Sequence, residues 1–577
     1  MHSMRKLMLG DEAVARGAYE AGVRVVSSYP GTPSTEITEF ASQYKEINSE
    51  WATNEKVAAE VAFGASLAGA RSMTCMKHVG VNVAADPLFT AAYTGVSGGL
   101  VIACADDPAM HSSQNEQDSR YYARAAHIPM LEPSDSQECK YFTKLAFELS
   151  EQYDTPVFLR LTTRIAHARS VVMMEDRQEA EVKHYKRDFM KYVMMPGMAR
   201  KRHVVVEQRM KKMEEDANTF AINRMEMNGR DLGVICSGSC YTYVKDALPS
   251  ASVLKLGMVH PLPQKLIADF AARVDHLVVI EELEPVIEEQ VAALGIAVEG
   301  KNLTGLQGEL SVSRLMRLFG ESAQLEPQDT LPARPPVLCP GCPHRGAFYA
   351  MKKLKLNVMG DIGCYTMSAL PPLNMLDACL CMGASIGMAF GAEKAQGKDF
   401  SRHTVAVLGD STFIHSGITA LIDAVYNGGT ITVVILDNRI TGMTGHQHNP
   451  ATGKDIHGNQ APQLDLEALC IACGVAHVTV VDPFDQKEML RVLREETARE
   501  AVSVIIARRP CVLLEKEETY PAAVVNCRNC GACLGLGCPA IERGDAGMRI
   551  NGALCVDCGL CVDVCPFKAI HAGRESK

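Results

Sequence analysis

The spacing of cysteines near the end of the chain is the clearest chemical signal in the sequence. The segment "CVDCGLCVDVCPFKAI" contains the pattern C-x2-C-x2-C-x3-C-P, and "CRNCGACLGLGCPAI" repeats it with one extra residue before the last cysteine. This pattern is typical of chains that bind two 4Fe-4S clusters, in which the fourth cysteine of each run ligates the cluster of the other run. The extra residue fits a looser turn and does not prevent ligation.

The exchange of fourth ligands defines two predicted cluster sites. The first set is Cys527, Cys530, Cys533 and Cys565, and the second set is Cys555, Cys558, Cys561 and Cys538. The alternative is a pair of zinc sites. Zinc ribbons usually place two C-x2-C pairs without a third cysteine at the next step, so the repeated three-cysteine pitch favours iron–sulfur clusters.

A second group of chemically useful residues lies at the ends of two apolar runs, "TVAVLGD" and "ITVVILDN". Such β-branched runs are typical of parallel strands that are buried on both faces, and the segment between them has helical periodicity. Asp410 ends the first run and Asn438 ends the second. Ligands bind at the carboxyl ends of parallel strands, and oxygen ligands suit Mg²⁺ that also holds a diphosphate. The alternative is that both residues merely form strand-end turns.

The bulk composition describes an ordinary globular protein. The chain has 577 residues, of which 47% are hydrophobic and 22% charged, so it can form several domains with large cores. Its net charge of -10 provides no basic field for nucleic acid. No apolar run reaches the roughly 20 residues of a membrane span, so we expect a cytoplasmic protein without a membrane partner. Six thiols that lie among apolar residues are expected to be buried: Cys75, Cys104, Cys379, Cys381, Cys470 and Cys473.

The alternation of strand and helix patterns around these residues predicts a multidomain α/β protein with doubly wound parallel sheets. "VRVVSSYPGTP" predicts a strand and a tight loop, followed by a helix with Thr32 as its cap and Pro33 at its first position. A charged stretch predicts a solvated helical connector. The predicted parts are an α/β domain (1–180), the connector (181–230), a second α/β domain (231–322), a proline-rich linker, a third α/β domain (337–515) and a ferredoxin-like tail (520–577).

Several motifs together resemble the 2-oxoacid:ferredoxin oxidoreductases. Gly409-Asp410-Ser411 with Asn438 resembles the thiamine diphosphate signature Gly-Asp-Gly followed by Asn, with serine at the third position as a departure. "CPGCPHRGAFYAMKK" and "GDIGCYTM" resemble the diphosphate-binding domain of the family, and "YPGTPSTE" and "NEKVAAEVAFGASLAGA" its pyrimidine-binding domain. The second α/β domain then corresponds to a transketolase C-terminal-like domain. The domain order and "TGMTGHQ" resemble the large subunit of the indolepyruvate branch.

The resemblance implies roles for particular residues. Glu55 would hydrogen-bond the pyrimidine ring of thiamine diphosphate, with Glu60 as the second choice. Thr32 would lie near the substrate carbonyl. Asp410, Asn438 and the backbone carbonyl of Ile440 would hold Mg²⁺. Without the resemblance, Glu55 would be interpreted as a surface carboxylate in the first turn of a helix.

The same resemblance places Gly341, Cys342 and Cys364 in the lining of the cofactor pocket. The alternative is that Cys339 and Cys342, with Cys364 as a third ligand, form half of a zinc or cluster site.

The predicted reaction couples the two ends of the chain. The resemblance implies that an arylpyruvate such as indolepyruvate reacts with coenzyme A and oxidised ferredoxin to give an aryl-acetyl-CoA, CO₂ and reduced ferredoxin. No Gly-x-Gly-x-x-Gly fingerprint offers a nicotinamide site, so the clusters are expected to take the electrons, one each. The family also uses a smaller β subunit, which predicts a hetero-oligomer. Two alternatives are a related enzyme for another bulky 2-oxo acid and a non-catalytic iron–sulfur electron-transfer subunit; a third is a zinc-binding interaction protein.

Overall fold

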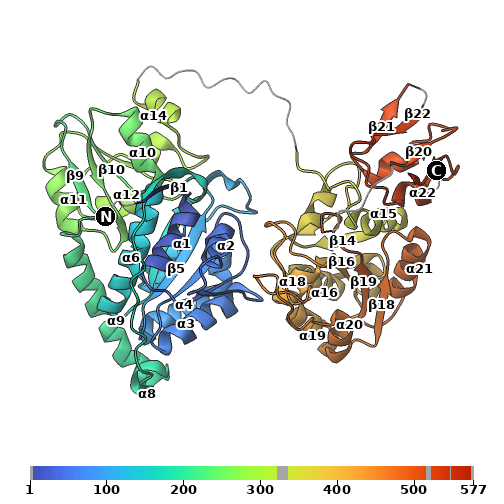
Figure 1. Ribbon diagram of the computed structural model, residues 1–577, viewed down its shortest axis with the longest axis horizontal. Helices are drawn as coiled ribbons and strands as arrows, with labels where there is room; N and C mark the ends of the chain where they lie inside the picture. The colour runs from blue at the N-terminus through green and yellow to red at the C-terminus, as the bar shows by residue number, and fades with distance from the viewer. Residues whose placement is uncertain (1–3, 321–334, 515–520, 546, 574–577) are drawn as a thin grey trace. The chain divides into compact units, whose positions relative to one another are not determined.

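The computed structural model describes residues 4–320, 335–514, 521–545 and 547–573, which form two compact units divided near residue 330 (Figure 1). Each unit is described separately. Outside the described residues lie most of the predicted proline-rich linker, residues 1–3, 321–322 and 515 of the predicted α/β domains, and residues 520, 546 and 574–577 of the predicted tail. No helix in the described ranges combines the length and the apolar character needed to cross a membrane.

The N-terminal unit is built on a seven-stranded sheet of order β12-β6-β7-β5-β4-β2-β3, whose strands are parallel except β12. Helices alternate with these strands, as the sequence predicts for a doubly wound fold. The strands are β2 (Val25–Ser28), β3 (Asn48–Trp51), β4 (Ser72–Lys77), β5 (Leu100–Asp106), β6 (Met130–Leu131), β7 (Val157–Thr162) and β12 (Met258–His260). The helices are α1 (Gly10–Glu20), α2 (Thr35–Ala41), α3 (Glu55–Leu67), α4 (His78–Thr94), α5 (Ser119–Ala126), α6 (Ser136–Tyr153) and α7 (Thr163–His167).

Both faces of this sheet are covered, because successive residues of its central strands enter different apolar clusters. Val101 and Ala103 of β5 pack with residues of α1, α2 and α6, whereas Ile102 and Cys104 pack with residues of α3, α4 and α5. This alternation explains why β5 is an unbroken apolar run in the sequence.

The second predicted domain (231–322) packs within the same unit, and its sheet also includes β9 from the predicted connector, which pairs with β11. Its four-stranded sheet has the order β13-β10-β11-β9, and β12 from the same segment extends the main sheet by pairing with β6. Its strands are β9 (Arg224–Glu226), β10 (Gly233–Cys236), β11 (Ser252–Lys255) and β13 (Leu277–Ile280), and its helices are α10 (Gly238–Ala247), α11 (Gln264–Ala271), α12 (Val286–Ala293), α13 (Lys301–Thr304) and α14 (Val312–Leu318). A short two-stranded sheet joins β1 (Arg5–Leu9) to β8 (Arg169–Met173).

The charged connector is helical, but it is not wholly solvated. It forms α8 (Phe189–Tyr192) and α9 (Pro196–Ala217), and the side chains of Val206, Met210 and Met213 in α9 are buried. Arg209 donates a hydrogen bond to the carbonyl of Asp154 at 2.8 Å. Apolar residues spaced by three and four positions therefore give the charged helix one apolar face, which is buried in the N-terminal unit.

The C-terminal unit contains a six-stranded parallel sheet of order β15-β14-β16-β17-β19-β18. Alternate residues of β16 pack on opposite faces, Val405 and Val407 on one and Ala406 and Leu408 on the other. The strands are β14 (Asn357–Gly360), β15 (Ala378–Cys379), β16 (Thr404–Gly409), β17 (Thr432–Asp437), β18 (His477–Val481) and β19 (Ser503–Arg508). The helices are α15 (His344–Leu354), α16 (Ala384–Gln396), α17 (Lys398–Ser401), α18 (Asp410–Thr412), α19 (Ile418–Tyr426), α20 (Leu466–Ala472) and α21 (Gln486–Thr497).

The cysteine-rich tail packs on this unit through α15. Its elements are β20 (Ala523–Val524), the 3₁₀ turn η4 (Ala532–Leu536), β21 (Ile541–Gly544), β22 (Gly547–Ile550), α22 (Leu560–Val564) and β23 (Ile570–His571). Tyr349 of α15 is buried together with Leu536 and Leu560 of the tail. The tail therefore has a small apolar core of its own that includes a residue of the neighbouring domain.

Two local expectations were wrong. Helix α2 begins at Thr35 with Ser34 at its cap, not at Thr32, because residues 31–34 form a turn in which the amide of Ser34 donates to the carbonyl of Gly31 at 2.9 Å. Cys379 and Cys381 are exposed. The reason is that β15, which contains Cys379, is a two-residue strand at the edge of its sheet.

Candidate functional site

Three oxygen-bearing groups meet at the carboxyl ends of β16 and β17. These strands are paired in parallel, with Gly409 opposite Leu436, so the residues that follow them are neighbours. The outer amide atom of Asn438 lies 2.9 Å from the carbonyl oxygen of Ile440 and 3.2 Å from Oδ1 of Asp410. With the amide oxygen in that place three oxygens face one another, and with the amide nitrogen there the group donates to both neighbours.

The donor set of this group fits a hard divalent cation. Asp410 is 1% exposed, and its Oδ2 has no hydrogen-bond partner in the structure. Burial raises the pKa of Asp410 to about 7, and the charge of Asp437 adds to the shift. A buried carboxylate needs a compensating charge or donor, and Mg²⁺ prefers carboxylate, amide and carbonyl oxygens. The structure thus brings together the three groups predicted to hold Mg²⁺.

The serine that departs from the signature has a polar partner. Ser411 accepts a hydrogen bond from the hydroxyl of Thr441 at 3.0 Å, and its amide donates to Oδ1 of Asp410 at 2.7 Å. Gly409 lies against Tyr365, since an added β-carbon would come within 3.1 Å of that ring. Serine at the third position is therefore compatible with the turn that presents Asp410.

Two of the residues predicted to line the cofactor pocket, Cys364 and Gly341, lie in different surroundings. The sulfur of Cys364 lies 3.5 Å from the position of a β-carbon on Gly442, close to Asn438 and Ile440. Gly341 instead lies beside Val556 of the tail, where an added β-carbon would come within 2.4 Å of it. Burial raises the pKa of Cys342 to about 12.

In the described part of the chain, no three cysteine sulfurs lie within 4.8 Å of one another. A tetrahedral zinc ion with Zn–S bonds of about 2.3 Å would need sulfurs about 3.8 Å apart.

The eight tail cysteines surround two separate cavities. One cavity is lined by Cys538, Cys555, Cys558 and Cys561. The other is lined by Cys527, Cys530, Cys533 and Cys565. Each group contains three cysteines of one run and the fourth cysteine of the other, so the structure brings together the members of both predicted sets.

Arg345 is a functional candidate that the sequence alone did not single out. Its side chain is buried, lines the cavity of Cys538 and donates a hydrogen bond to the carbonyl of Leu536 at 2.9 Å. It also donates to the carbonyl of Cys339 at 3.1 Å. A buried cation therefore lies between the start of the diphosphate-binding domain and one cysteine group.

The pyrimidine-domain candidates belong to the N-terminal unit, where Glu55 and Glu60 differ in burial. Glu55 is 5% exposed in the first turn of α3, whose cap Asn54 accepts a hydrogen bond from the amide of Val57 at 2.9 Å. Glu60 is 46% exposed and pairs with Lys56. The interpretation of Glu55 as a surface carboxylate is therefore wrong, and Glu60 fits that description instead.

The loop that contains Thr32 lies beside a lysine that the sequence analysis missed, since an added β-carbon at Gly31 would come within 3.1 Å of Cβ of Lys77. Lys77 ends β4, next to β2 in the sheet, and its Nζ donates to the carbonyl of Ser112 at 2.7 Å. The hydroxyl of Ser112 donates to the carbonyl of Thr32 at 3.4 Å. Burial lowers the pKa of Lys77 to about 8, opposed by the charge of Asp107. A lysine that directly follows the mostly apolar segment "MTCM" was the available signal.

Comparison with known proteins gives three family matches. Residues 16–227 match "Pyruvate flavodoxin/ferredoxin oxidoreductase, thiamine diP-bdg", and residues 361–507 match "Thiamine pyrophosphate enzyme, C-terminal TPP binding domain". Residues 548–571, which contain the second cysteine run, match "4Fe-4S binding domain".

Curated relatives align over nearly the whole chain. The indolepyruvate oxidoreductase subunit IorA of Archaeoglobus fulgidus is 40% identical over 614 residues, which covers 99% of this chain and 98% of that protein. The subunit of the same name from Methanothermobacter marburgensis is 41% identical over 605 residues, covering 98% and 97%. A solved 2-oxoglutarate:ferredoxin oxidoreductase from Magnetococcus marinus is similar with a TM-score of 0.45 at 16% identity, over 56% of this chain and 65% of that one.

Proposed function

The chain belongs to the family of indolepyruvate oxidoreductase IorA subunits, and we propose that it catalyses the oxidative decarboxylation of indolepyruvate with thiamine diphosphate. One indolepyruvate, one coenzyme A and two oxidised ferredoxins give indoleacetyl-CoA, CO₂, two reduced ferredoxins and a proton. The proposed acyl acceptor and electron acceptor rest on the family and on the cluster-binding tail. The domains that bind thiamine diphosphate and a 4Fe-4S cluster are matched directly.

The single observation that carries this function is the convergence of Asp410, Asn438 and the carbonyl of Ile440 at one edge of a parallel sheet. These groups would hold Mg²⁺ against the diphosphate of the coenzyme. Gly409 leads directly into α18 (Asp410–Thr412), and the start of a helix suits phosphate oxygens. A protein that only scaffolds clusters has no need for such a set of buried oxygens.

Glu55 would hold the proton that the pyrimidine ring exchanges. Its carboxyl is buried at the start of α3, where water competes little for a hydrogen bond. When bound, thiamine diphosphate supplies a carbon nucleophile and a place to store the electrons of the broken bond. Glu60 is an exposed partner of Lys56 and would have no such part.

Lys77 and the Thr32 loop would bind the carboxylate of the substrate. A buried ammonium group beside a polar loop is suited to an anion, and Thr32 offers a hydroxyl for the neighbouring carbonyl. The proposal thereby adds a cation to the role that the family resemblance implies for Thr32.

Two 4Fe-4S clusters would carry the electrons away one at a time. The cavity of Cys538, Cys555, Cys558 and Cys561 also contains Gly341 and Arg345 in its wall. We therefore assign the first electron to the cluster of that cavity and the second transfer to the cluster of Cys527, Cys530, Cys533 and Cys565.

The smaller β subunit and ferredoxin are the proposed protein partners. The experiment is anaerobic co-purification of the chain with the smaller subunit, followed by assays of ferredoxin reduction with a panel of 2-oxo acids and coenzyme A. We expect indolepyruvate to give the highest kcat/KM. A higher value for an aliphatic or dicarboxylic 2-oxo acid would contradict the substrate, and full activity of the chain alone would contradict the partner.

A further inference from the structure

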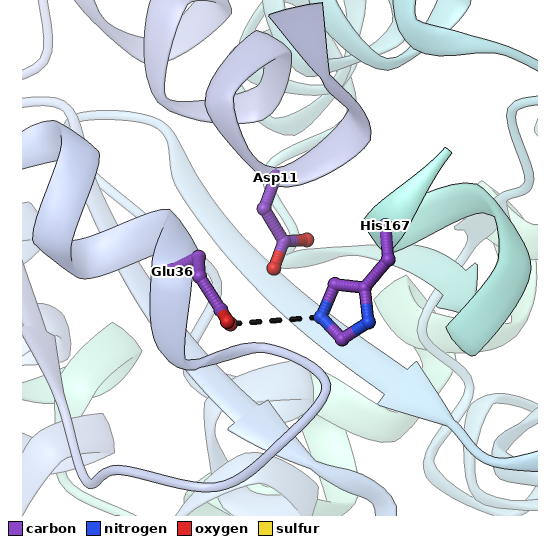
Figure 2. A group of neighbouring side chains, drawn as sticks. All are labelled: Asp11, Glu36 and His167. Atoms are coloured by element: carbon purple, nitrogen blue, oxygen red, sulfur yellow. Dashed lines mark ion pairs between the residues drawn. The ribbon is translucent and has the colours of Figure 1, made fainter. Parts of the chain in front are cut away.

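Three side chains outside the cofactor residues gather at one point of the N-terminal unit (Figure 2). Asp11 comes from the first turn of α1, Glu36 from the first turn of α2, and His167 from the end of α7. A carboxylate oxygen of each acid and an imidazole nitrogen all lie within 4.8 Å of one another. Three segments far apart in the sequence thus present ligand-type atoms to one small volume.

Asp11 is the unusual member of the group. Its side chain is completely buried, and neither of its oxygens has a hydrogen-bond partner in the structure. Figure 2 shows this carboxylate directed toward the space between Glu36 and His167. Burying a carboxylate without a donor or counter-charge is costly, and burial together with the nearby Glu36 raises the pKa of Asp11 well above its ordinary range. The position therefore lacks a positive partner.

Glu36 and His167 are arranged to supply the rest of a coordination sphere. Oε2 of Glu36 lies 3.7 Å from Nε2 of His167, and this pairing lowers the pKa of Glu36. Both side chains are about one-third exposed, so they can rotate by the small amount that coordination requires. The group has a buried floor at Asp11 and an opening to solvent at His167.

We propose that Asp11, Glu36 and His167 bind a divalent transition-metal ion of the zinc class. Zinc takes imidazole nitrogen and carboxylate oxygen at about 2.0 to 2.2 Å, and sites with three protein ligands complete the tetrahedron with water. The imidazole separates this site from the oxygen-only site at Asp410, since Mg²⁺ prefers oxygen ligands whereas imidazole suits zinc and its neighbours. The ion would fasten α2, and the Thr32 loop before it, to α1 and α7.

The test uses the full-length chain with its iron–sulfur clusters reconstituted anaerobically, so that the tail thiols are occupied. The chain is equilibrated with Zn²⁺, freed of loosely bound metal, and analysed for zinc content and for the zinc X-ray absorption spectrum. We expect one zinc per chain with nitrogen and oxygen neighbours only. Asp11→Asn, Glu36→Gln and His167→Asn should each lose that zinc, and Glu39→Gln, on the same helix as Glu36, should retain it.

Each outcome bears on the proposal. A wild-type chain that retains no zinc, zinc with a sulfur shell near 2.3 Å, or zinc retained by all three ligand variants would overturn it. Iron content and circular dichroism show whether a variant is folded. The thermal midpoint of the wild-type chain gives a second readout, because it should rise with zinc concentration if the folded state binds the ion, and no rise would also contradict the site.

Discussion

The carboxyl group of Glu55 lies directly against the backbone of Gly80, where an added β-carbon would come within 2.7 Å of Oε1 and 2.8 Å of Cγ of Glu55. Gly80 is in the first turn of α4, and Glu55 is in the first turn of α3. The absence of a side chain at position 80 therefore leaves the room in which the Glu55 carboxyl sits.

Replacing Gly80 with alanine should reduce activity without unfolding the protein. Alanine is favoured over glycine in a helix by about 1 kcal/mol, but its methyl group would displace the Glu55 carboxyl. We expect kcat to fall at least about tenfold, which corresponds to about 1.4 kcal/mol. The control is Gly64→Ala in α3, where an added β-carbon meets nothing within 4 Å. Equal kcat in the two variants would show that the Glu55 position does not limit turnover.

Asp410→Asn should weaken coenzyme binding and leave the clusters intact. The change removes the charge that compensates Mg²⁺, so the Kd for thiamine diphosphate in the presence of Mg²⁺ should rise by at least about tenfold, or about 1.4 kcal/mol. Titration calorimetry measures the Kd, and iron analysis checks the clusters. Asp423→Asn, an exposed position in α19, is the matched control. Unchanged affinity in Asp410→Asn would remove this residue from the site.

The lowered pKa of Lys77 leads us to expect that substrate binding depends on pH. Its pKa is lowered to about 8, so the ammonium charge is present below that pH and is lost as pH rises through it. If this charge binds the substrate carboxylate, the concentration of indolepyruvate for half-maximal cluster reduction without coenzyme A should increase above about pH 8. Lys77→Met should raise it at all pH values and abolish the dependence, whereas Lys56→Met should behave as wild type. A pH profile that survives in Lys77→Met would assign the titration to another group.

The buried guanidinium of Arg345 should raise the reduction potential of the cluster beside it. A reduced cluster carries one more negative charge, so loss of the buried guanidinium should make reduction harder. Arg345→Leu should lower the reduction potential of one cluster by an amount on the order of 100 mV, from the Coulomb energy of a nearby charge in a medium of intermediate dielectric. Arg345→Lys keeps the positive charge and should therefore retain most of the wild-type reduction potential. Redox titration followed by electron paramagnetic resonance measures both, and equal potentials in the two variants would contradict the assignment.

Local sequence patterns were sufficient to predict which residues come together in some parts of the site. Asp410 and Asn438 could be paired because a strand–helix–strand pattern fixes that their strand ends are neighbours. The cysteine sets could be written from spacing because the chemistry of the clusters constrains the ligands. In both cases the contact follows from a short segment or a known rule.

Contacts that depend on the order of strands in the sheet or on the packing of distant helices could not be predicted from local sequence patterns. Lys77 meets the Thr32 loop only because β4 lies beside β2, and Asp11 meets His167 only because α1 and α7 pack together. The prediction that Thr32 caps the following helix was wrong for a related reason. Capping signals were present, but a turn closed by Ser34 places the start of the helix at Thr35.

The most direct test of the central claim is anaerobic stopped-flow absorbance of the co-purified complex mixed with indolepyruvate in the absence of ferredoxin. With thiamine diphosphate and Mg²⁺ bound, we predict bleaching near roughly 400 nm, where iron–sulfur clusters absorb, equal to as many as two electrons per chain. Glu60→Gln should bleach like wild type and Glu55→Gln should not. Clusters that stay oxidised in the loaded wild-type complex would contradict the claim that the substrate electrons reach them through the thiamine site.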